Sequence, residues 1–475
     1  MSCSPSGRVG LGMALAMGCT APTAKRTDTA GTTLDSADPA EGCTDAQGWL
    51  ASQPQTCFAV LQDAVDHAIV GDRLTLLDPA DGAAVHLSIT HDLHMDGSGL
   101  TLTSDGTGAV ITVLSGRITL SQLHLRGGSG DLDPGFGEGE VTIGGVVNAL
   151  RADHLGMDQV SLSGGEADWG GGLMGPADGT LHLTQTTVDS CEARRLGGGV
   201  WMRQGDLWKV TVSASRAPYA AGLALRSAVD DPTTSTFSDV RITANHASVK
   251  GGGLHLAGGA SLTAADLTID ENTAQQAAGA HVYDSVGAWS GGTLTTNSAQ
   301  VGGGGLMIDG GAPALDHLNI VANGVTGDGL PDAEGVGGGI WAVRATADLT
   351  TISILRNVAG WGAGLMLAGD PMVVALPTLT LHDVALHDNQ GAAGARGSAI
   401  VVSHAALMAT DLEIHRNAGQ HVGGLHVESG WAQVTADWAD NTPVDVGMDG
   451  SAPIASVVAG ATVQCDSVRG TCTVE

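Results

Sequence analysis

Lysine is nearly absent from this chain of 475 residues, where it occurs only at Lys25, Lys209 and Lys250. Lysine and arginine together number 20 against 50 aspartates and glutamates, so the formal net charge is −30 at pH 7. A charge of this size repels nucleic acid, and we therefore expect no nucleic-acid partner.

Long apolar runs are also missing. No stretch approaches the roughly 18 apolar residues that a membrane-spanning helix needs. Glycine, in contrast, supplies 72 residues, and each glycine inside a helix costs about 1 kcal/mol relative to alanine. The composition therefore disfavours a mainly helical fold.

A short motif, an apolar residue three positions before an asparagine, returns along the chain. Successive asparagines are 24 to 34 residues apart, and Ser163, Cys191 and Ser215 occupy the same position in earlier copies. We call this column the asparagine ladder. Its members are Asn245, Asn272, Asn297, Asn323, Asn357, Asn389, Asn417 and Asn441.

Each copy continues with a run of small residues, mostly glycine, and then an aliphatic anchor residue. Ten anchors lie between Leu173 and Leu425, a mean step of 28 residues. After the anchor, apolar residues alternate, as in Leu254-His255-Leu256, which indicates a strand with one apolar face. A regular period of this length indicates stacked units that bury their apolar faces against one another.

Two or three short strands fit one unit if each strand pairs with its copy in the next unit. The sequence therefore predicts an all-β fold, a single-stranded parallel β-helix of about 12–14 rungs spaced about 4.8 Å apart. The usual rule for parallel crossovers makes it right-handed.

The ladder and the glycines both have structural interpretations. An asparagine amide donates and accepts, so it can bond to the same amide one rung away, and asparagine tolerates the left-handed backbone of a turn. The glycines permit positive φ in a tight turn. Because the runs lack a Gly-Lys-Ser/Thr ending, we do not interpret them as a phosphate-binding loop.

The pairing of apolar-x-x-Asn with Gly-Gly-Ala/Gly-aliphatic resembles the repeats of the polymorphic outer-membrane protein family, over roughly residues 140 to 441. The resemblance implies a right-handed parallel β-helix passenger domain. This chain differs from the family in carrying Ile or Leu where the family has Phe.

The segment before the repeats is expected to cap them. Phe58, Leu61, Val65, Ala68 and Ile69 have helical spacing, and a strand-like stretch, 74–77, follows. This order is similar to the start of pectin-lyase-like β-helices, in which a helix covers the first coil. We therefore assign residues 43–140 to the N-terminal cap and first rungs, 141–441 to the Gly/Asn repeats, and 442–475 to a C-terminal cap.

The extreme N-terminus has the pattern of an export signal. Arg8 precedes an apolar stretch, 9–17, and then Gly18-Cys19. The pattern resembles that of bacterial lipoproteins, which implies a signal peptide at 1–18 and lipidation of Cys19. Residues 20–42 are rich in Thr, Ala and Asp and are expected to form a flexible tether. We expect an outer-membrane or cell-surface lipoprotein held by its lipid alone; secretion or a periplasmic location is the alternative.

The other cysteines agree with an oxidising compartment. Cys43 and Cys57 are close enough in the sequence to link the N-terminal cap, and Cys465 and Cys472 can close the C-terminal end. Cys191 is left as a buried, inert thiol. Free thiols in a cytosolic protein are the alternative, and zinc is not expected because the pairs lack neighbouring ligands.

The residue after each anchor forms a column without charge, apart from histidine, which strand alternation turns outward. We call this column the outer strip. It is predicted to bind a protein or glycan, with Trp201 and Trp341 as stacking residues; coverage by loops, or a column of ordinary strand-forming residues, is the alternative. Its members are Met174, Trp201, Ala224, His255, His281, Met307, Trp341, Met366, Val401 and His426.

A column of aspartates offers a different site. Asp239, Asp266, Asp383 and Asp411 each lie six residues before a ladder asparagine, and on adjacent rungs such carboxylates could share calcium or act as acid and base. Other residue types interrupt the column and no Lys or Arg cluster accompanies it. We therefore favour solvated carboxylates, with no cofactor and no metal site.

The sequence as a whole favours a non-catalytic surface scaffold or adhesin-like module that binds an envelope or extracellular protein or glycan. A carbohydrate-active β-helix enzyme, a polysaccharide lyase or glycoside hydrolase, is the alternative.

Overall fold

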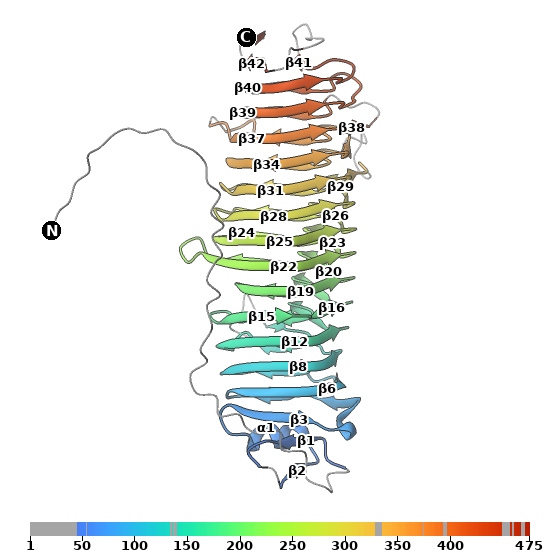
Figure 1. The fold of residues 1–475 in the computed structure, drawn as a ribbon, viewed down its shortest axis with the longest axis vertical. Helices are drawn as coiled ribbons and strands as arrows, with labels where there is room; N and C mark the ends of the chain where they lie inside the picture. The colour runs from blue at the N-terminus through green and yellow to red at the C-terminus, as the bar shows by residue number, and fades with distance from the viewer. Residues whose placement is uncertain are drawn as a thin grey trace, which may run out of the picture. The chain divides into compact units, whose positions relative to one another are not determined.

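Parallel pairing between successive coils dominates the structure. The computed structural model describes residues 45–53, 55–133, 135, 140–327, 335–373, 375–392, 397–448, 457, 460–466 and 471–475. Within these residues, 32 strands form one sheet and 11 form another. Figure 1 shows the long strands stacked in chain order. The protein is a parallel β-helix, as the repeat predicted.

The first column of strands, which we call the long sheet, pairs in parallel from one coil to the next. It has fourteen levels in the described residues, which agrees with the predicted 12–14 rungs. Its strands are β3 (Asp72–Leu76), β6 (Leu93–Ser104), β8 (Arg117–Arg126), β12 (His154–Ser163), β15 (Thr180–Thr184) with β16 (Thr187–Asp189), β19 (Gly205–Ser213), β22 (Thr233–Thr243), β25 (Ala260–Asp270), β28 (Ala288–Thr295), β31 (Ala314–Val321), β34 (Ala347–Leu355), β37 (Thr378–His387), β39 (Ile400–His415) and β40 (Leu425–Ala439).

The second column, the anchor sheet, begins at the aliphatic anchors and pairs in parallel in the same way; β39 and β40 bend through both columns. Its other strands are β5 (Leu87–Ile89), β7 (Ile111–Val113), β11 (Val147–Asn148), β14 (Leu173–Met174), β18 (Val200–Met202), β21 (Leu223–Ser227), β24 (Leu254–Gly258), β27 (Ala280–Tyr283), β30 (Leu306–Asp309), β33 (Ile340–Val343), β36 (Leu365–Ala368) and β41 (Val446–Met448).

The third column, the short sheet, follows the ladder asparagines and is the separate sheet of 11 strands among the described residues. Its strands are β9 (Asp131–Asp133), β10 (Val141–Ile143), β13 (Glu166–Trp169), β17 (Glu192–Leu196), β20 (Arg216–Tyr219), β23 (His246–Lys250), β26 (Thr273–Gln276), β29 (Ser298–Gly302), β32 (Gly324–Val325), β35 (Val358–Ala359) and β38 (Gln390–Gly391).

A continuous apolar core fills the coils. Leu254 and Leu256 of β24 are fully buried, as are Phe237 of β22 and Trp289 of β28. Burying each such side chain contributes roughly 1.5 to 3 kcal/mol. One cluster of buried residues extends from Leu50 to Cys465. Each coil is therefore stabilised mainly by the coils above and below it.

Short antiparallel elements cover the N-terminal end. Helix α1 (Leu61–His67) packs Leu61, Ala64 and Val65 into the core, which agrees with the predicted cap. The prediction is wrong for Phe58 and Ile69: Phe58 lies on a short strand before the helix, the helix ends at His67, and Ile69 is 62% exposed. The remaining elements at this end are β1 (Gly48–Leu50), β2 (Cys57–Phe58), η1 (Asp78–Ala80) and β4 (Ala83–Val85), of which β1 pairs antiparallel with β2 and β3.

A hairpin covers the other end. Strand β42 (Thr462–Asp466) pairs antiparallel with β40 and with β43 (Thr471–Val474). The predicted disulfide between Cys465 and Cys472 joins its two strands. Cys57 is also disulfide-bonded. The predicted signal peptide, Cys19, the tether and Cys43 lie outside the described residues.

The asparagine ladder is continuous from Asn245 to Asn441. Asn272 shows the pattern: its Oδ1 accepts from the backbone N–H and the Nδ2 of Asn245, both at 3.0 Å, and its Nδ2 donates to Asn297 Oδ1 at 3.0 Å. The same Nδ2 donates to the Ile242 carbonyl one coil back at 2.9 Å. Each amide therefore satisfies buried backbone groups of the neighbouring coil as well as its own ladder partner.

The glycines make room for the ladder. At Gly253, a Cβ would lie 2.9 Å from Asn272 Nδ2 and 2.6 Å from the Gly279 carbonyl oxygen of the next coil. The same closeness recurs between Gly305 and Asn323, also at 2.9 Å. Real Cβ atoms do not approach other heavy atoms so closely. The two half-motifs recur together because the glycine of one coil lies against the asparagine of the next.

Two expectations about the ladder are wrong in detail. The left-handed residue is the one before each asparagine, such as Ala244 with φ of 55°, rather than the asparagine itself. Ser163 does not occupy the ladder position, because it pairs with Asp189, which places Gly165 beside Cys191. Cys191 is buried as expected, and burial raises the pKa of its thiol to about 11.

The ladder predicts a large effect of one substitution. Asn297→Ala leaves the buried Asn272 backbone N–H without its partner and removes one hydrogen bond from the buried Ile269 carbonyl and one from the Asn272 side chain. Because each unsatisfied buried group costs about 1 to 3 kcal/mol, we expect the free energy of unfolding in urea to fall by several kcal/mol. The matched control is Asn319→Ala, an exposed asparagine of β31. Equal losses in the two variants would contradict a structural ladder.

Candidate functional site

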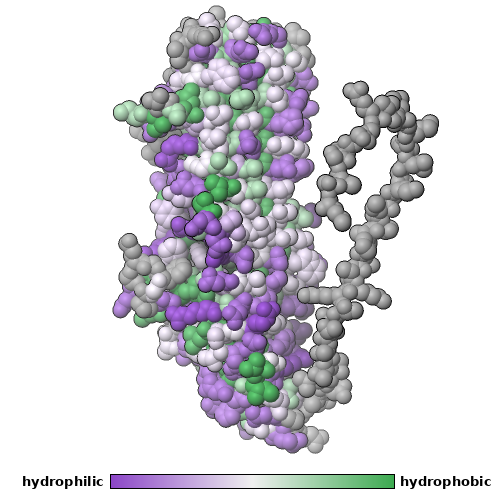
Figure 2. Space-filling view, turned by 90° about the vertical axis from the view of Figure 1, so that its left-hand side faces the viewer, coloured by the Kyte–Doolittle hydropathy of each residue, from purple (hydrophilic) through white to green (hydrophobic). Residues whose placement is uncertain are grey.

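The outer strip is buried rather than exposed. Met174 and Val401 have no exposed surface, and Trp201 is only 8% exposed. Trp341 is half-buried, and a Cβ at Gly302 would lie 2.5 Å from its ring. On the face drawn in Figure 2, hydrophobic residues lie in small separate groups. The strip therefore does not form a flat apolar binding surface.

The strip is buried because the anchor sheet and the short sheet meet at a concave corner. A residue with left-handed backbone at the start of the run, such as Gly251 with φ of 75° or Ala220 with φ of 52°, turns the chain from one sheet into the other. The last residue of each short-sheet strand then faces the strip across this corner. Trp169, Leu196, Tyr219 and Lys250 are these last residues, and they are in register on successive coils.

A cavity of about 630 Å³ opens along part of this corner, and we call it the basic groove. Its residues come from five neighbouring coils and combine arginine, lysine, histidine and aromatic side chains. Both tyrosines of the chain are among them, 44% and 39% exposed. The residues are Trp169, Arg194, Arg195, Leu196, Pro218, Tyr219, Arg226, Lys250, His255, His281 and Tyr283.

Two buried histidines of the outer strip form the floor of the basic groove. His255 Nδ1 lies 3.2 Å from His281 Nδ1, so one nitrogen donates to the other. The Tyr283 ring lies 5.6 Å from the His281 ring. Burial lowers the pKa of His255 well below its ordinary value and also lowers the pKa of His281. Both rings are therefore neutral at pH 7.

One buried carboxylate fixes the cations at the edge of this floor. Lys250 Nζ lies 2.9 Å from Asp309, and the Arg344 guanidinium donates to the same carboxylate. His281 Nε2 lies 3.9 Å from it. These neighbours, His281 first, hold the pKa of Asp309 well below its ordinary value. Asp309 is therefore ionised and keeps Lys250 in a fixed position.

A second cavity of about 890 Å³ adjoins the first, since Arg226 and Tyr283 line both. It also contains Arg203, which forms ion pairs with Asp178 and Asp231. This cavity thus combines carboxylates with arginines. Its other residues are Trp201, Ser227, Ala228, Val229, Asp230, Ala257, Gly258 and Asp284.

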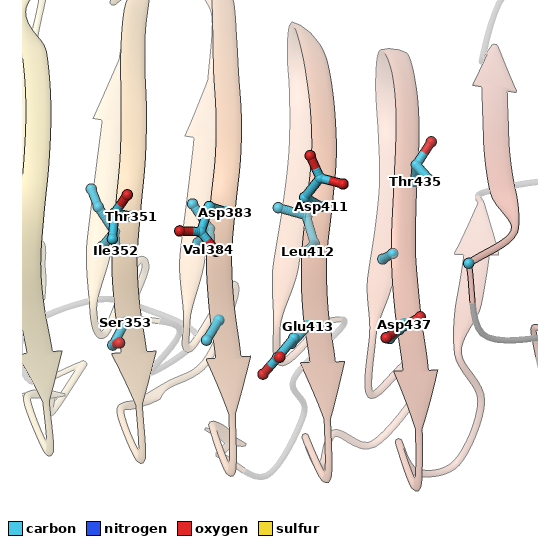
Figure 3. A pocket seen from close by; sticks show the side chains of 13 residues that line it. Thr351, Ile352, Ser353, Asp383, Val384, Asp411, Leu412, Glu413, Thr435 and Asp437 are labelled. Atoms are coloured by element: carbon cyan, nitrogen blue, oxygen red, sulfur yellow. The ribbon is translucent and has the colours of Figure 1, made fainter. Parts of the chain in front are cut away.

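A third cavity, of about 410 Å³, lies on the long sheet and has an acidic lining. Figure 3 shows Asp383, Asp411, Glu413 and Asp437 on neighbouring strands, and their carboxylates do not turn toward a common point. Asp411 pairs with His382 at 3.2 Å. In the part of the chain that the structure describes, no three His, Cys, Asp or Glu side chains are grouped to hold a metal ion.

Backbone conformation explains the aspartate column. Asp383 and Asp411 have φ of 55° and 56°, and both are exposed. The interrupting residues His317, Thr351 and Gly291 have the same left-handed backbone, with φ of 53°, 52° and 84°. Aspartate and glycine adopt this conformation more readily than most residues. The column therefore marks a kink in each long strand, and its carboxylates face solvent.

The sequence reasoning missed most of the basic groove. It identified His255 and His281 through the strip but not Arg226 and Tyr283. Arg226 lies two residues after the strip residue Ala224 on β21, and Tyr283 lies two residues after His281 on β27, so both share the outward alternation. It also passed over the residue before each glycine run, such as Lys250. Both signals were present in the repeat, yet only the corner between two sheets brings them together.

The chain is therefore a parallel β-helix protein with a groove lined by aromatic and basic side chains. Comparison of the chain with protein-family models, with curated proteins and with solved structures found no match. No helix in the described part of the chain has the length and hydropathy needed to cross a bilayer.

The buried histidines predict a dependence of stability on acid. In the unfolded chain, a histidine with a pKa near 6.5 takes up a proton that the buried ring does not, so the free energy of unfolding falls as pH drops below about 6.5. His255→Met places a residue at this position that the strip already uses at Met307. We expect the fall between pH 7.5 and 5.5 to be about 1 kcal/mol smaller in this variant, measured by urea unfolding. The exposed-residue variant His421→Gln serves as control, and identical pH profiles for all three proteins would contradict the expectation.

Proposed function

We propose that this protein is a non-catalytic binding module of the cell envelope in which the β-helix is a rigid support and the basic groove holds a glycan. The observation that carries the proposal is the gathering of both tyrosines, a tryptophan and four cations in one concave site. Sugar rings stack their apolar faces on aromatic side chains, and their hydroxyl groups accept hydrogen bonds from arginine and lysine.

The shape of the site favours a glycan over a folded protein. A stable protein interface buries about 800 Å² on each partner and has an apolar centre. The apolar outer strip is covered, so it offers no such centre. The two cavities share Arg226 and Tyr283 and therefore lie side by side, an arrangement that suits an extended chain crossing from one to the other.

A carbohydrate-active enzyme is the second candidate. The second cavity supports it, because Asp230, Asp231 and Asp284 lie there with Arg203 and Arg226. Asp284 raises the pKa of the neighbouring Tyr283 hydroxyl, which disfavours that hydroxyl as a base at neutral pH. Release of reducing or unsaturated ends from any glycan would favour the enzyme and overturn the non-catalytic function.

Loss of the aromatic rings tests the glycan site. We expect Tyr219→Ala combined with Tyr283→Ala to weaken retention in affinity electrophoresis by about tenfold or more, because two stacking contacts are worth roughly 1 to 3 kcal/mol. The panel consists of neutral and charged polysaccharides. Trp208→Ala is the matched control, since Trp208 has the same 44% exposure as Tyr219 but lies on the long sheet. Unchanged retention of every bound glycan in the tyrosine variant would contradict the site.

The envelope location rests on the N-terminal sequence. If Cys19 is lipidated, the protein expressed in a bacterial host should carry a labelled fatty acid and sediment with membranes, whereas Cys19→Ser should be unlabelled. Cys3→Ser, within the predicted signal peptide, serves as control. Labelling that persists in Cys19→Ser would contradict lipid anchoring and favour secretion or a periplasmic location.

A further inference from the structure

The lining of the basic groove has a charge opposite to that of the chain. The chain carries 50 acidic and 20 basic residues, yet four cations and no carboxylate line this cavity in the described residues. Because lysine and arginine are 20 of 475 residues, chance would place fewer than one of them among the eleven residues that line the groove. The reversal of charge is local, because the other two cavities both contain aspartate.

Two of the four cations are already neutralised. Arg194 Nε lies 2.9 Å from Asp168, and Lys250 Nζ lies 2.9 Å from Asp309. Arg195 and Arg226 are exposed and form no ion pair with a described residue. They lie on different sheets, Arg195 on β17 and Arg226 on β21, and both line the groove. Two guanidinium groups are thus left to meet a ligand.

The surroundings strengthen the field of these two groups. The neutral floor histidines and the tyrosine rings replace water with less polar material, and concave walls of this kind focus an electrostatic potential. Salt at physiological strength screens charges beyond about 8 Å. Carboxylates farther than this from the groove therefore have little influence on an anion that touches Arg195 or Arg226, whereas Asp284, which interacts with Tyr283, opposes an anion at that end of the groove.

We infer that the basic groove selects an anionic glycan, whose carboxylate or sulfate groups are held by Arg195 and Arg226 while its sugar rings stack on Tyr219 and Tyr283. A guanidinium presents parallel N–H donors that match the oxygens of such groups. This inference rests on the proposed function and adds the charge of the ligand to it.

Dextran and dextran sulfate test the inference, because they share a backbone and differ in charge. Affinity for each is measured by calorimetry with the wild-type protein, with Arg195→Gln/Arg226→Gln and with the control Arg356→Gln, an exposed arginine that follows β34 and does not line the groove. We expect the wild type and the control to bind dextran sulfate at least tenfold more tightly than dextran, and the double variant to lose this preference. Added salt should weaken the binding of dextran sulfate to the wild type and leave the binding of dextran unchanged.

Each other result overturns the inference. A wild-type protein that binds both polymers equally, or neither, has no selectivity for anions. A preference that survives in the double variant lies elsewhere on the surface. Equal affinity for a single-stranded oligonucleotide would make a nucleic acid the occupant. If a neutral glycan of the panel binds the wild type and is lost in the tyrosine variant, the proposed function stands although this inference fails.

Discussion

The contact between an asparagine amide and the glycine one coil earlier is the constraint on which the structure depends. Asn272 needs space at Gly253 for its Nδ2, and the same closeness pairs Gly305 with Asn323. The amide then satisfies backbone groups of the neighbouring coil that water cannot reach. Because both residues must recur at fixed places, coils vary in length only outside this contact. The steps of 24 to 34 residues between ladder asparagines show how much variation the loops absorb.

The same geometry produces the groove. A residue with positive φ turns the short sheet sharply into the anchor sheet, and the corner buries the first outward residue of each anchor strand. Two columns of side chains remain accessible: the residues two positions after the outer strip on each anchor strand, and the last residues of the short-sheet strands, just before each glycine run. Where these columns carry Arg226, Tyr283 and Tyr219, the corner becomes a basic and aromatic site. These side chains lie on strands of the stacked coils rather than on loops.

The fold could be predicted from the sequence because the same local pattern of residues recurs in many repeats. The ladder, the strand alternation, the covering helix near Leu61 and the disulfide between Cys465 and Cys472 are all confirmed. Prediction was less accurate where a segment occurs only once in the chain or where the repeat motif has diverged. Ser163 was placed two residues from the true ladder position, and Ile69 was included in a helix that ends earlier.

From the sequence alone, the aspartate column has two explanations, a ligand site or solvated carboxylates, and the structure supports the second. Spacing alone made Asp383 and Asp411 candidates for calcium, and the interruptions at Thr351 and Gly291 looked like defects. The left-handed φ shared by all of them shows that backbone conformation, rather than a ligand, sets the column. The structure also separates the acidic cavity from the basic one, which no count of charged residues reveals.

By itself, the sequence determined the class of fold, the register of the coils and the position of the ladder, because these follow from patterns that repeat within each 28-residue unit. Only the tertiary structure decided which outward residues meet water and which side chains form a site. Exposure of the outer strip depends on the angle between two sheets, and the groove joins residues from five coils that lie far apart in the chain. The sequence pattern gives neither the angle between the sheets nor the set of residues that line the groove, because both are fixed only when the coils stack.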